Sequence, residues 1–219
     1  MAKSKQSIIV GTSTDIGKTF LTCKIIEEYR ESKIDINVVK PIITGFDIND
    51  EDCDSVKILK TLETDITIQN IDLISPFRLK TPISPISAAR IEDTQIHYSE
   101  ILEFCQNKIS KSLESGVDLI IESAGGLMTP ICKGKSFLDL VKDLDIDVIL
   151  VGACFLGGIS NILTNYECLK SKNIQNIEII VNNHVDFDDK FLKIDDFIDE
   201  IGYFVDCKVF LVDNFFYLK

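Results

Sequence analysis

The sequence has little of several residue types on which whole classes of protein depend. Tryptophan is absent and aromatic residues make up 8% of the 219 positions, so the core must be mostly aliphatic. The only histidines, His97 and His184, exclude a histidine-rich metal site. Seven cysteines occur without a C-x-x-C pair, mostly inside apolar stretches, which indicates reduced thiols in a reducing compartment.

Positive charge and long apolar runs are also scarce. Lys and Arg number 23 against 35 Asp and Glu, and the net charge of −12 argues against a nucleic-acid partner. The longest apolar run, Val148–Ile159, contains three glycines and is too short to cross a bilayer. The apolar stretch Ser7–Val10 is too short for a signal peptide. We therefore expect a cytoplasmic protein without a membrane partner.

Short β-branched runs alternate with longer helix-like stretches, and this pattern predicts a P-loop-like α/β fold. We expect one domain over residues 1–219, with a mostly parallel sheet of about seven strands flanked by helices. Six strands are read from the sequence: Ser7–Val10, Ile36–Val39, Val117–Ile121, Val148–Gly152, Ile177–Val181 and Val209–Val212. Helices are expected at Gly17–Glu31, Asp54–Leu62, Pro85–Ile91, Ser99–Ser115, Ser136–Leu144, Gly158–Ser171 and Asp189–Ile201. The polar segments Asn49–Ile71 and Asp186–Asp199 are interpreted as solvated surface.

A glycine-rich turn joins the first strand to the first helix. It reads GTSTDIGKT, with Gly11 and Gly17 separated by five residues and followed by Lys18 and Thr19. Backbone N–H groups of such a turn, with the helix N-terminus, cradle phosphates. The lysine reaches the β- and γ-phosphates, and the threonine hydroxyl can bind Mg²⁺. The stretch predicts a nucleoside triphosphate site, for ATP with magnesium.

Polar residues follow other expected strands, and each allows two interpretations. Lys40, before Pro41, is either a solvated strand end or a neighbour of the phosphate loop. Asp54 is either a helix N-cap or a carboxylate near magnesium. Glu122 is a strand-end residue or the acidic partner of the metal in a P-loop. The amide of Asn182 or Asn183 could read a base edge, and the helix start at 156–161 could hold a carboxylate on free N–H groups.

The motifs together resemble the dethiobiotin synthetase family of biotin biosynthesis. They are GTSTDIGKT (11–19), KPIITG (40–45), the Asp54 segment, TPISPISAA (81–89), IESAGG (121–126), VGACFLGGISN (151–161) and VNNHV (181–185). The resemblance implies that ATP, CO₂ and 7,8-diaminopelargonate give dethiobiotin, ADP and phosphate. One amine captures CO₂ as a carbamate, whose oxygen attacks the γ-phosphoryl group. The second amine then closes the ureido ring and expels phosphate.

The resemblance also implies roles for individual residues and a homodimer. Lys40 and Lys18 would stabilise charge during catalysis, and Thr19, Asp54 and Glu122 would hold Mg²⁺. Thr14 and Thr44 would contact the diamine or its carbamate, and segment 156–161 of one subunit would hold the substrate carboxylate of the other. The nucleotide contacts would be Asp15, Ile16, Gly17, Lys18, Thr19, Phe20, Asp54, Glu122, Ser123, Ala124, Gly125 and Asn183.

Three features depart from the family pattern. Asp15 stands where a glutamate is frequent, and Ser123 replaces a glycine. The family usually continues past its last strand with a proline-bearing loop near the base, whereas this chain ends in VFLVDNFFYLK. Residues 209–211 are expected to replace that wall.

Two other classes were compared with this interpretation. A dimeric ATPase switch of the partitioning or division-site type would carry a second lysine in the phosphate loop, where Ser13 stands here. An amidoligase of the cobyrinate type would need a glutaminase domain, for which the chain has no room.

Overall fold

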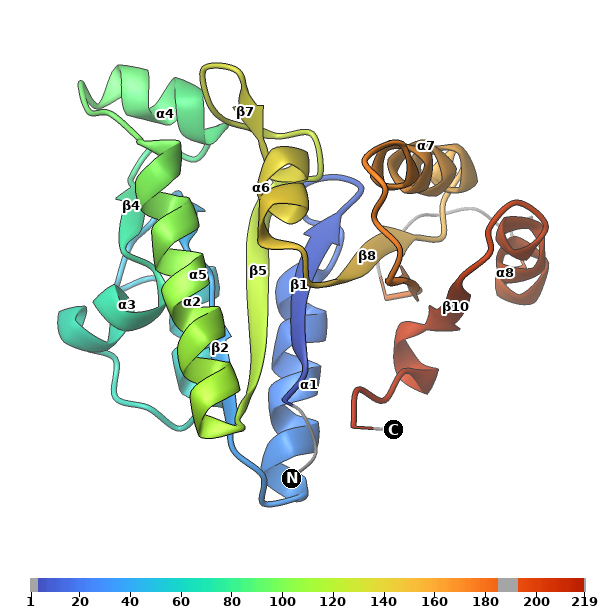
Figure 1. The fold of residues 1–219 in the computed structure, drawn as a ribbon, viewed down its shortest axis with the longest axis horizontal. Helices are drawn as coiled ribbons and strands as arrows, with labels where there is room; N and C mark the ends of the chain where they lie inside the picture. Colours follow the sequence, from blue (N-terminus) through green and yellow to red (C-terminus); the bar gives the residue numbers. More distant parts are fainter. Residues whose placement is uncertain (1–3, 185–192, 219) are drawn as a thin grey trace.

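The central element is a six-stranded, entirely parallel sheet in the order β10-β9-β8-β1-β5-β2 (Figure 1). The computed structural model describes residues 4–184 and 193–218. Its strands are β1 Gln6–Gly11, β2 Ile36–Val39, β5 Asp118–Gly126, β8 Asp147–Ala153, β9 Ile177–Asn182 and β10 Lys208–Leu211. The fold class is confirmed, but the main sheet has six strands rather than about seven. Whether residues 1–219 form a single domain stays a prediction.

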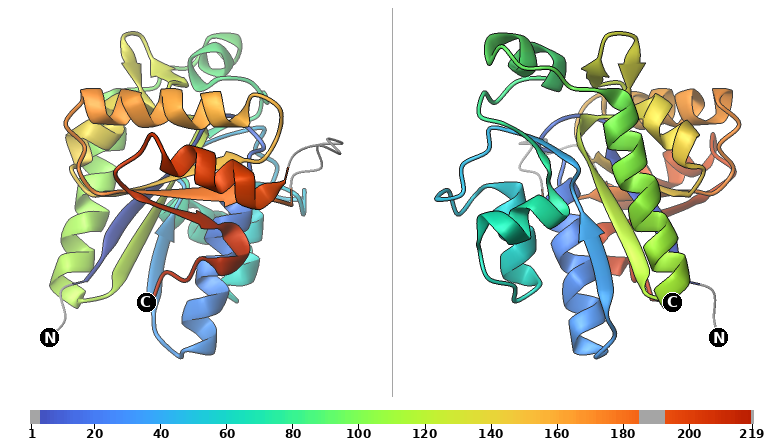
Figure 2. Two further views of the ribbon diagram at one scale, coloured as in Figure 1. Left: turned by 90° about the vertical axis from the view of Figure 1, so that its right-hand side faces the viewer. Right: turned by 60° about the vertical axis from the view of Figure 1, so that its left-hand side comes forward.

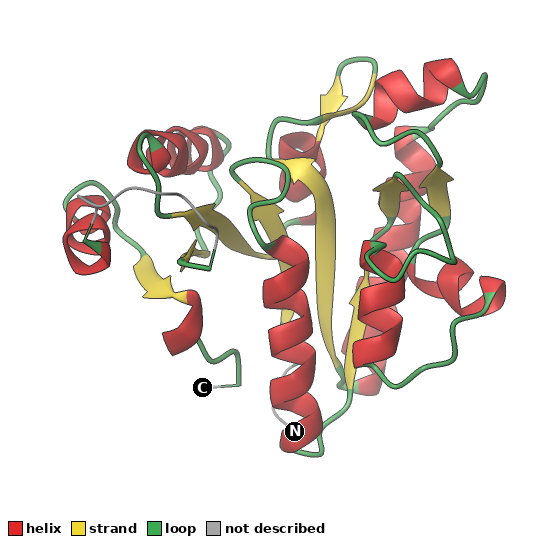
Figure 3. Cartoon of the chain, turned by 180° about the vertical axis from the view of Figure 1, so that it is seen from behind, coloured by secondary structure: helices red, strands yellow, loops and turns green. Residues whose placement is uncertain are grey.

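Helices cover both faces of this sheet, as continuous apolar parallel strands require. Helix α1 lies on one face, seen in front of β1 and β5 in Figure 3, and α5 and α6 lie on the opposite face. Helices α7 and α8 pack on each other beside β8 and β10 (Figure 2). The bounds are α1 Lys18–Glu31, α2 Asp54–Thr61, α3 Ile68–Ile74, α4 Pro85–Ile91, α5 Tyr98–Ser115, α6 Phe137–Leu144, α7 Gly158–Ser171 and α8 Ile194–Gly202.

The structure differs from the expected elements at three of their positions. Helix α3 begins inside the segment 49–71, which was interpreted as solvated surface; it is seven residues long and buries just Ile71 and Ile74. The helix expected from Asp189 begins at Ile194, and residues 185–192 lie outside the described part of the chain. Strand β5 runs on through Glu122 to Gly126 instead of ending at Ile121.

Two small sheets complete the fold. Strand β3 (Ile42–Thr44) pairs in parallel with β4 (Phe77–Leu79), and β6 (Pro130–Cys132) pairs antiparallel with β7 (Lys135–Ser136). The chain that follows Lys40 forms β3. The β3–β4 pair lies along the edge of the molecule where β1 and β5 end. The main-sheet core is mostly aliphatic, as expected, and all seven cysteines are free thiols.

The last residues of the chain fold back onto α1. The short 3₁₀ turn η1 (Val212–Asn214) follows β10, and Tyr217 then inserts into the core with 2% exposure. Its hydroxyl lies 2.8 Å from that of Ser7, and the Glu28 carboxylate accepts hydrogen bonds from the backbone N–H groups of Tyr217 and Leu218. The C-terminal segment is therefore part of the core. None of the helices in the described ranges is long and apolar enough to span a membrane.

We expect Tyr217→Ala to lower the free energy of unfolding by about 3–5 kcal/mol, because it deletes a buried aromatic side chain. Phe216→Ala is the matched control, since Phe216 is 46% exposed. Urea unfolding measures both variants. Equal losses for the two would contradict the assigned packing.

Candidate functional site

The turn between β1 and α1 has the geometry of a phosphate-binding loop. Gly17, the N-cap of α1, has φ +100°, and a Cβ at this position would lie 2.1 Å from the Asn182 side-chain nitrogen. That nitrogen donates to the Ile16 carbonyl over 3.1 Å and ties the loop to the end of β9. The positive φ and the close approach together require glycine. Asp15 also has a positive φ, of 55°.

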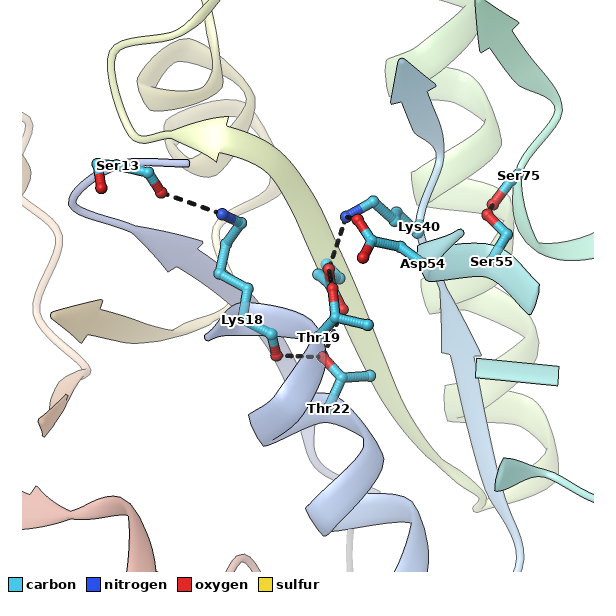
Figure 4. A network of polar contacts seen from close by, with 9 residues as sticks. Ser13, Lys18, Thr19, Thr22, Lys40, Asp54, Ser55 and Ser75 are labelled. Atoms are coloured by element: carbon cyan, nitrogen blue, oxygen red, sulfur yellow. Dashed lines mark hydrogen bonds and ion pairs between the residues drawn. The ribbon is translucent and has the colours of Figure 1, made fainter. Parts of the chain in front are cut away.

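Lys18 extends back over this loop. Its Nζ donates to the Ser13 carbonyl over 3.2 Å, and its side chain is largely buried (Figure 4). Burial, together with the nearby ammonium of Lys40, lowers the pKa of Lys18 to about 8. A polyphosphate bound in the loop would add negative charge beside this lysine and raise its pKa.

Lys40 lies between two carboxylates at the centre of the site. Its Nζ is 2.6 Å from Glu122 Oε1 and 2.7 Å from Asp54 Oδ2, and both Lys40 and Glu122 are buried. Burial alone would lower the pKa of Lys40, but the charges of Glu122 and Asp54 outweigh it and raise that pKa. Burial would likewise raise the pKa of Asp54, and Lys40 outweighs it and lowers that pKa. Lys40 and Asp54 are therefore both charged at neutral pH.

Sheet order brings these groups together. Strand β5 lies between β1 and β2, so Glu122 faces both α1, which follows β1, and Lys40, which follows β2. Thr19 Oγ1 donates to Glu122 Oε1 over 2.6 Å (Figure 4). Asp54 comes from the start of α2. A 2.7 Å hydrogen bond between the buried hydroxyls of Ser55 and Ser75 holds this end of the helix (Figure 4).

A cavity of about 450 Å³ opens over this cluster. Most of the predicted site residues line it, and Ile43 and Pro82 line it without having been predicted. The lining is Thr14, Asp15, Gly17, Lys18, Thr19, Phe20, Lys40, Ile43, Thr44, Asp54, Pro82, Ala124 and Gly125. The contacts of these residues with a ligand stay predictions, but most of the predicted residues line the same cavity.

Four predicted residues lie outside this lining. Ile16 is a core residue, and Glu122 lies beneath the cavity floor with no exposed surface. Strand alternation turns Ser123 to the sheet face opposite Glu122, where its hydroxyl has no hydrogen-bond partner among the described residues. The φ of Ser123 is not positive, so the strand accepts the serine that replaces the family's glycine. Asn183 lies farther along the same edge.

Asn183 belongs to a cluster that joins β9 to the C-terminal turn. Its side-chain nitrogen donates to Asp213 over 3.1 Å, and the Asp213 carboxylate is also 2.7 Å from His184 Nε2. The His184 ring packs against Phe20, whose centroid is 5.3 Å away. Asp213 therefore supplies a C-terminal contact to Asn183, and the wall expected from residues 209–211 stays a prediction.

Sequence reasoning missed one buried residue of the cluster, Thr22. Its Oγ1 donates to Glu122 Oε2 over 2.6 Å. The available signal was spacing, because residues three apart on a helix share a face, and Thr22 lies three residues after Thr19.

Known proteins of similar sequence agree in one family. A family model described as an AAA domain matches residues 5–205. The ATP-dependent dethiobiotin synthetase BioD of Phenylobacterium zucineum is 34% identical over 180 residues, which cover 81% of this chain and 76% of that protein. The enzyme of the same name from Methanocaldococcus jannaschii is 34% identical over 80% of this chain and 78% of its own. The chain belongs to the dethiobiotin synthetase family.

Solved structures of other proteins resemble this chain in fold. The MinD cell division protein of Aquifex aeolicus superposes with a TM-score of 0.52 at 15% identity, covering 94% of this chain and 80% of that chain. The signal recognition particle 54 kDa protein of Aeropyrum pernix, solved with GDP, gives 0.55 at 12% identity, covering 95% and 42%. At these identities the likeness shows the nucleotide-binding α/β fold alone, so it does not favour a cell-division role over dethiobiotin synthetase membership.

We expect ADP binding at pH 8 to take up protons. About half of the Lys18 side chains are neutral in the free protein at that pH, and the bound phosphates raise the pKa of Lys18. Calorimetry in HEPES and in Tris should give binding enthalpies that differ by about half of the difference between the buffers' ionisation enthalpies. At pH 6.5 Lys18 is already charged and its proton uptake should be lost, while the terminal phosphate of ADP, with a pKa of about 6, releases protons instead. Equal enthalpies at pH 8 would contradict the assignment.

Proposed function

We propose that the protein is an ATP-dependent dethiobiotin synthetase, a cyclo-ligase that makes dethiobiotin from 7,8-diaminopelargonate and CO₂. An amine nitrogen of the diamine attacks CO₂ and loses a proton, which gives a carbamate. A carbamate oxygen attacks the γ-phosphorus of ATP and expels ADP. The second amine attacks the resulting carbamic–phosphoric anhydride, which closes the ureido ring and releases phosphate.

The observation that carries this proposal is the meeting of Lys18 and Lys40 in one cavity of a chain from this family. The two lysines leave different elements, and Lys40 is buried between Glu122 and Asp54. A phosphate loop alone needs one lysine. A second ammonium beside it can bind a second anion. A carbamate next to the γ-phosphate would be such an anion.

Each lysine then has a distinct task. Lys18, from the helix N-terminus, neutralises charge on the phosphoryl group in transfer. Lys40 stabilises the carbamate and the phosphoryl oxygens that approach each other. Thr14 and Thr44 offer hydroxyls at the rim of the cavity for the diamine or its carbamate. Asn183, oriented by Asp213, would meet the adenine.

The oxygen groups present fit a magnesium ion bound together with the nucleotide. Mg²⁺ prefers hard oxygen ligands and is usually held by one or two carboxylates plus substrate phosphates. Thr19 Oγ1 and the carboxylates of Asp54 and Glu122 gather around Lys40. No group of three or more His, Cys, Asp or Glu side chains arranged for a metal occurs in the described residues, so the phosphates would complete the site. The ion would neutralise phosphate charge during transfer.

The proposal includes a homodimer. Leu156, just before α7, is 83% exposed, and Gly157 turns the chain with φ +91° into that helix. A large apolar side chain this exposed is consistent with contact to a second copy. The segment 156–161 of one subunit would then hold the substrate carboxylate of the other on the N–H groups of α7.

A direct assay tests the function. Purified protein is incubated with 7,8-diaminopelargonate, bicarbonate, Mg²⁺ and each nucleoside triphosphate, and the product is identified by mass. We expect dethiobiotin, with ADP release that requires both the diamine and bicarbonate. ATP turnover that needs neither, and responds instead to DNA or lipid, would contradict the proposal.

We expect Lys40→Ala to lower kcat for product formation by at least about 10²-fold, while ATP still binds. The loop and Lys18 hold the phosphates, whereas Lys40 acts on the carbamate and the reacting oxygens. Lys57→Ala is the matched control, because Lys57 lies on α2 with a half-exposed side chain paired to Asp52. Calorimetric ATP binding and a melting curve accompany the rate. Normal turnover by Lys40→Ala would refute this role.

A further inference from the structure

The two oxygens of the Glu122 carboxylate have different partners. Oε1 accepts from Thr19 and from Lys40, each over 2.6 Å, and both donors line the cavity. Oε2 accepts from Thr22 over 2.6 Å, and among the described residues no other donor to it is found. One oxygen therefore faces the site, and the other is turned into the protein.

Thr22 is placed so that it can act only through Glu122. It has no exposed surface and does not line the cavity. Its Oγ1 also lies 3.0 Å from the Lys18 carbonyl, four residues earlier on α1. A hydroxyl has one hydrogen to donate, and the shorter contact to a charged carboxylate is the stronger bond. The hydrogen is therefore directed at Glu122 Oε2.

We propose that Thr22 is a positioning residue, which fixes the Glu122 carboxylate so that Oε1 stays turned toward Thr19 and Lys40, on the side where a divalent cation would bind. The inference rests on the proposed function only in taking that cation to arrive with the nucleotide. Glu122 can turn about its terminal bond, because that torsion has a broad minimum. The hydrogen bond from Thr22 to Oε2 restricts this rotation, whatever Thr19 and Lys40 bind.

Such a residue is expected to matter for the metal more than for folding. Partners that orient a metal ligand typically change metal affinity by about 10- to 100-fold when they are removed. A useful comparison is Ser7 on β1, a hydroxyl that is equally buried. It lies 2.8 Å from the Tyr217 hydroxyl and is not among the residues that line the cavity. Both bonds contribute to folding, but only the bond from Thr22 acts on Glu122.

The test measures Mn²⁺ binding to the ADP-saturated protein by electron paramagnetic resonance, because Mn²⁺ uses the same oxygen ligands as Mg²⁺. Thr22→Val keeps the shape of the side chain and removes the donor, and should weaken Mn²⁺ binding about 10- to 100-fold. Thr22→Ser keeps the donor and should bind as the unmodified protein does. Ser7→Ala should melt at a lower temperature and still bind Mn²⁺ normally. Thr22→Ala serves in place of Thr22→Val if the latter does not fold.

Three results would overturn the proposal. They are unchanged Mn²⁺ affinity in Thr22→Val or Thr22→Ala, equal weakening in Thr22→Ser, and equal weakening in Ser7→Ala. The first shows that the bond is not needed, the second that keeping the hydroxyl donor is not enough to preserve the site, and the third that any loss of stability has the same effect. None of these measurements uses diaminopelargonate, so failure of the proposed reaction would be seen separately in the product assay.

Discussion

The site depends on one buried negative charge, the Glu122 carboxylate. A carboxylate with no exposed surface is costly unless charged and hydrogen-bonding partners surround it. Glu122 collects an ammonium from Lys40 and hydroxyls from Thr19 and Thr22, so each of these side chains is fixed by the need to compensate the same charge. These contacts hold the groups of the site in one geometry, and phosphoryl transfer depends on such positioning.

Sheet order makes this possible. The segments that follow β1 and β2 are separated in the sheet by β5, and a carboxylate on that middle strand reaches both. The small β3–β4 pair and the bond between Ser55 and Ser75 then bring Asp54 to the other side of Lys40. Because Lys40 is held on two sides and Lys18 returns over its own loop, two cations lie in one cavity despite a protein of net charge −12. The local field there is set by a few neighbours and not by the total charge.

The C-terminal segment is tied to distant parts of the chain. The residues that follow β10 turn back, bury Tyr217 and are held by Glu28 of α1. On the way, Asp213 meets Asn183 and His184. That residues 209–211 form a wall near the base stays a prediction.

The sequence by itself determined the phosphate loop, the strands of the main sheet and most helices, because these follow from local chemistry: glycine spacing, apolar periodicity and the Lys-Thr pair after the turn. The four short strands of the two small sheets were not among the expected elements. The sequence also placed Lys40, Asp54 and Glu122 as candidates. Tertiary structure alone decided how they meet, that Glu122 lies inside β5 beneath the cavity, that Ser123 points away, and that Thr22 completes the cluster. Strand order and the exact end of a strand depend on packing between distant segments, and no local pattern of residues encodes them.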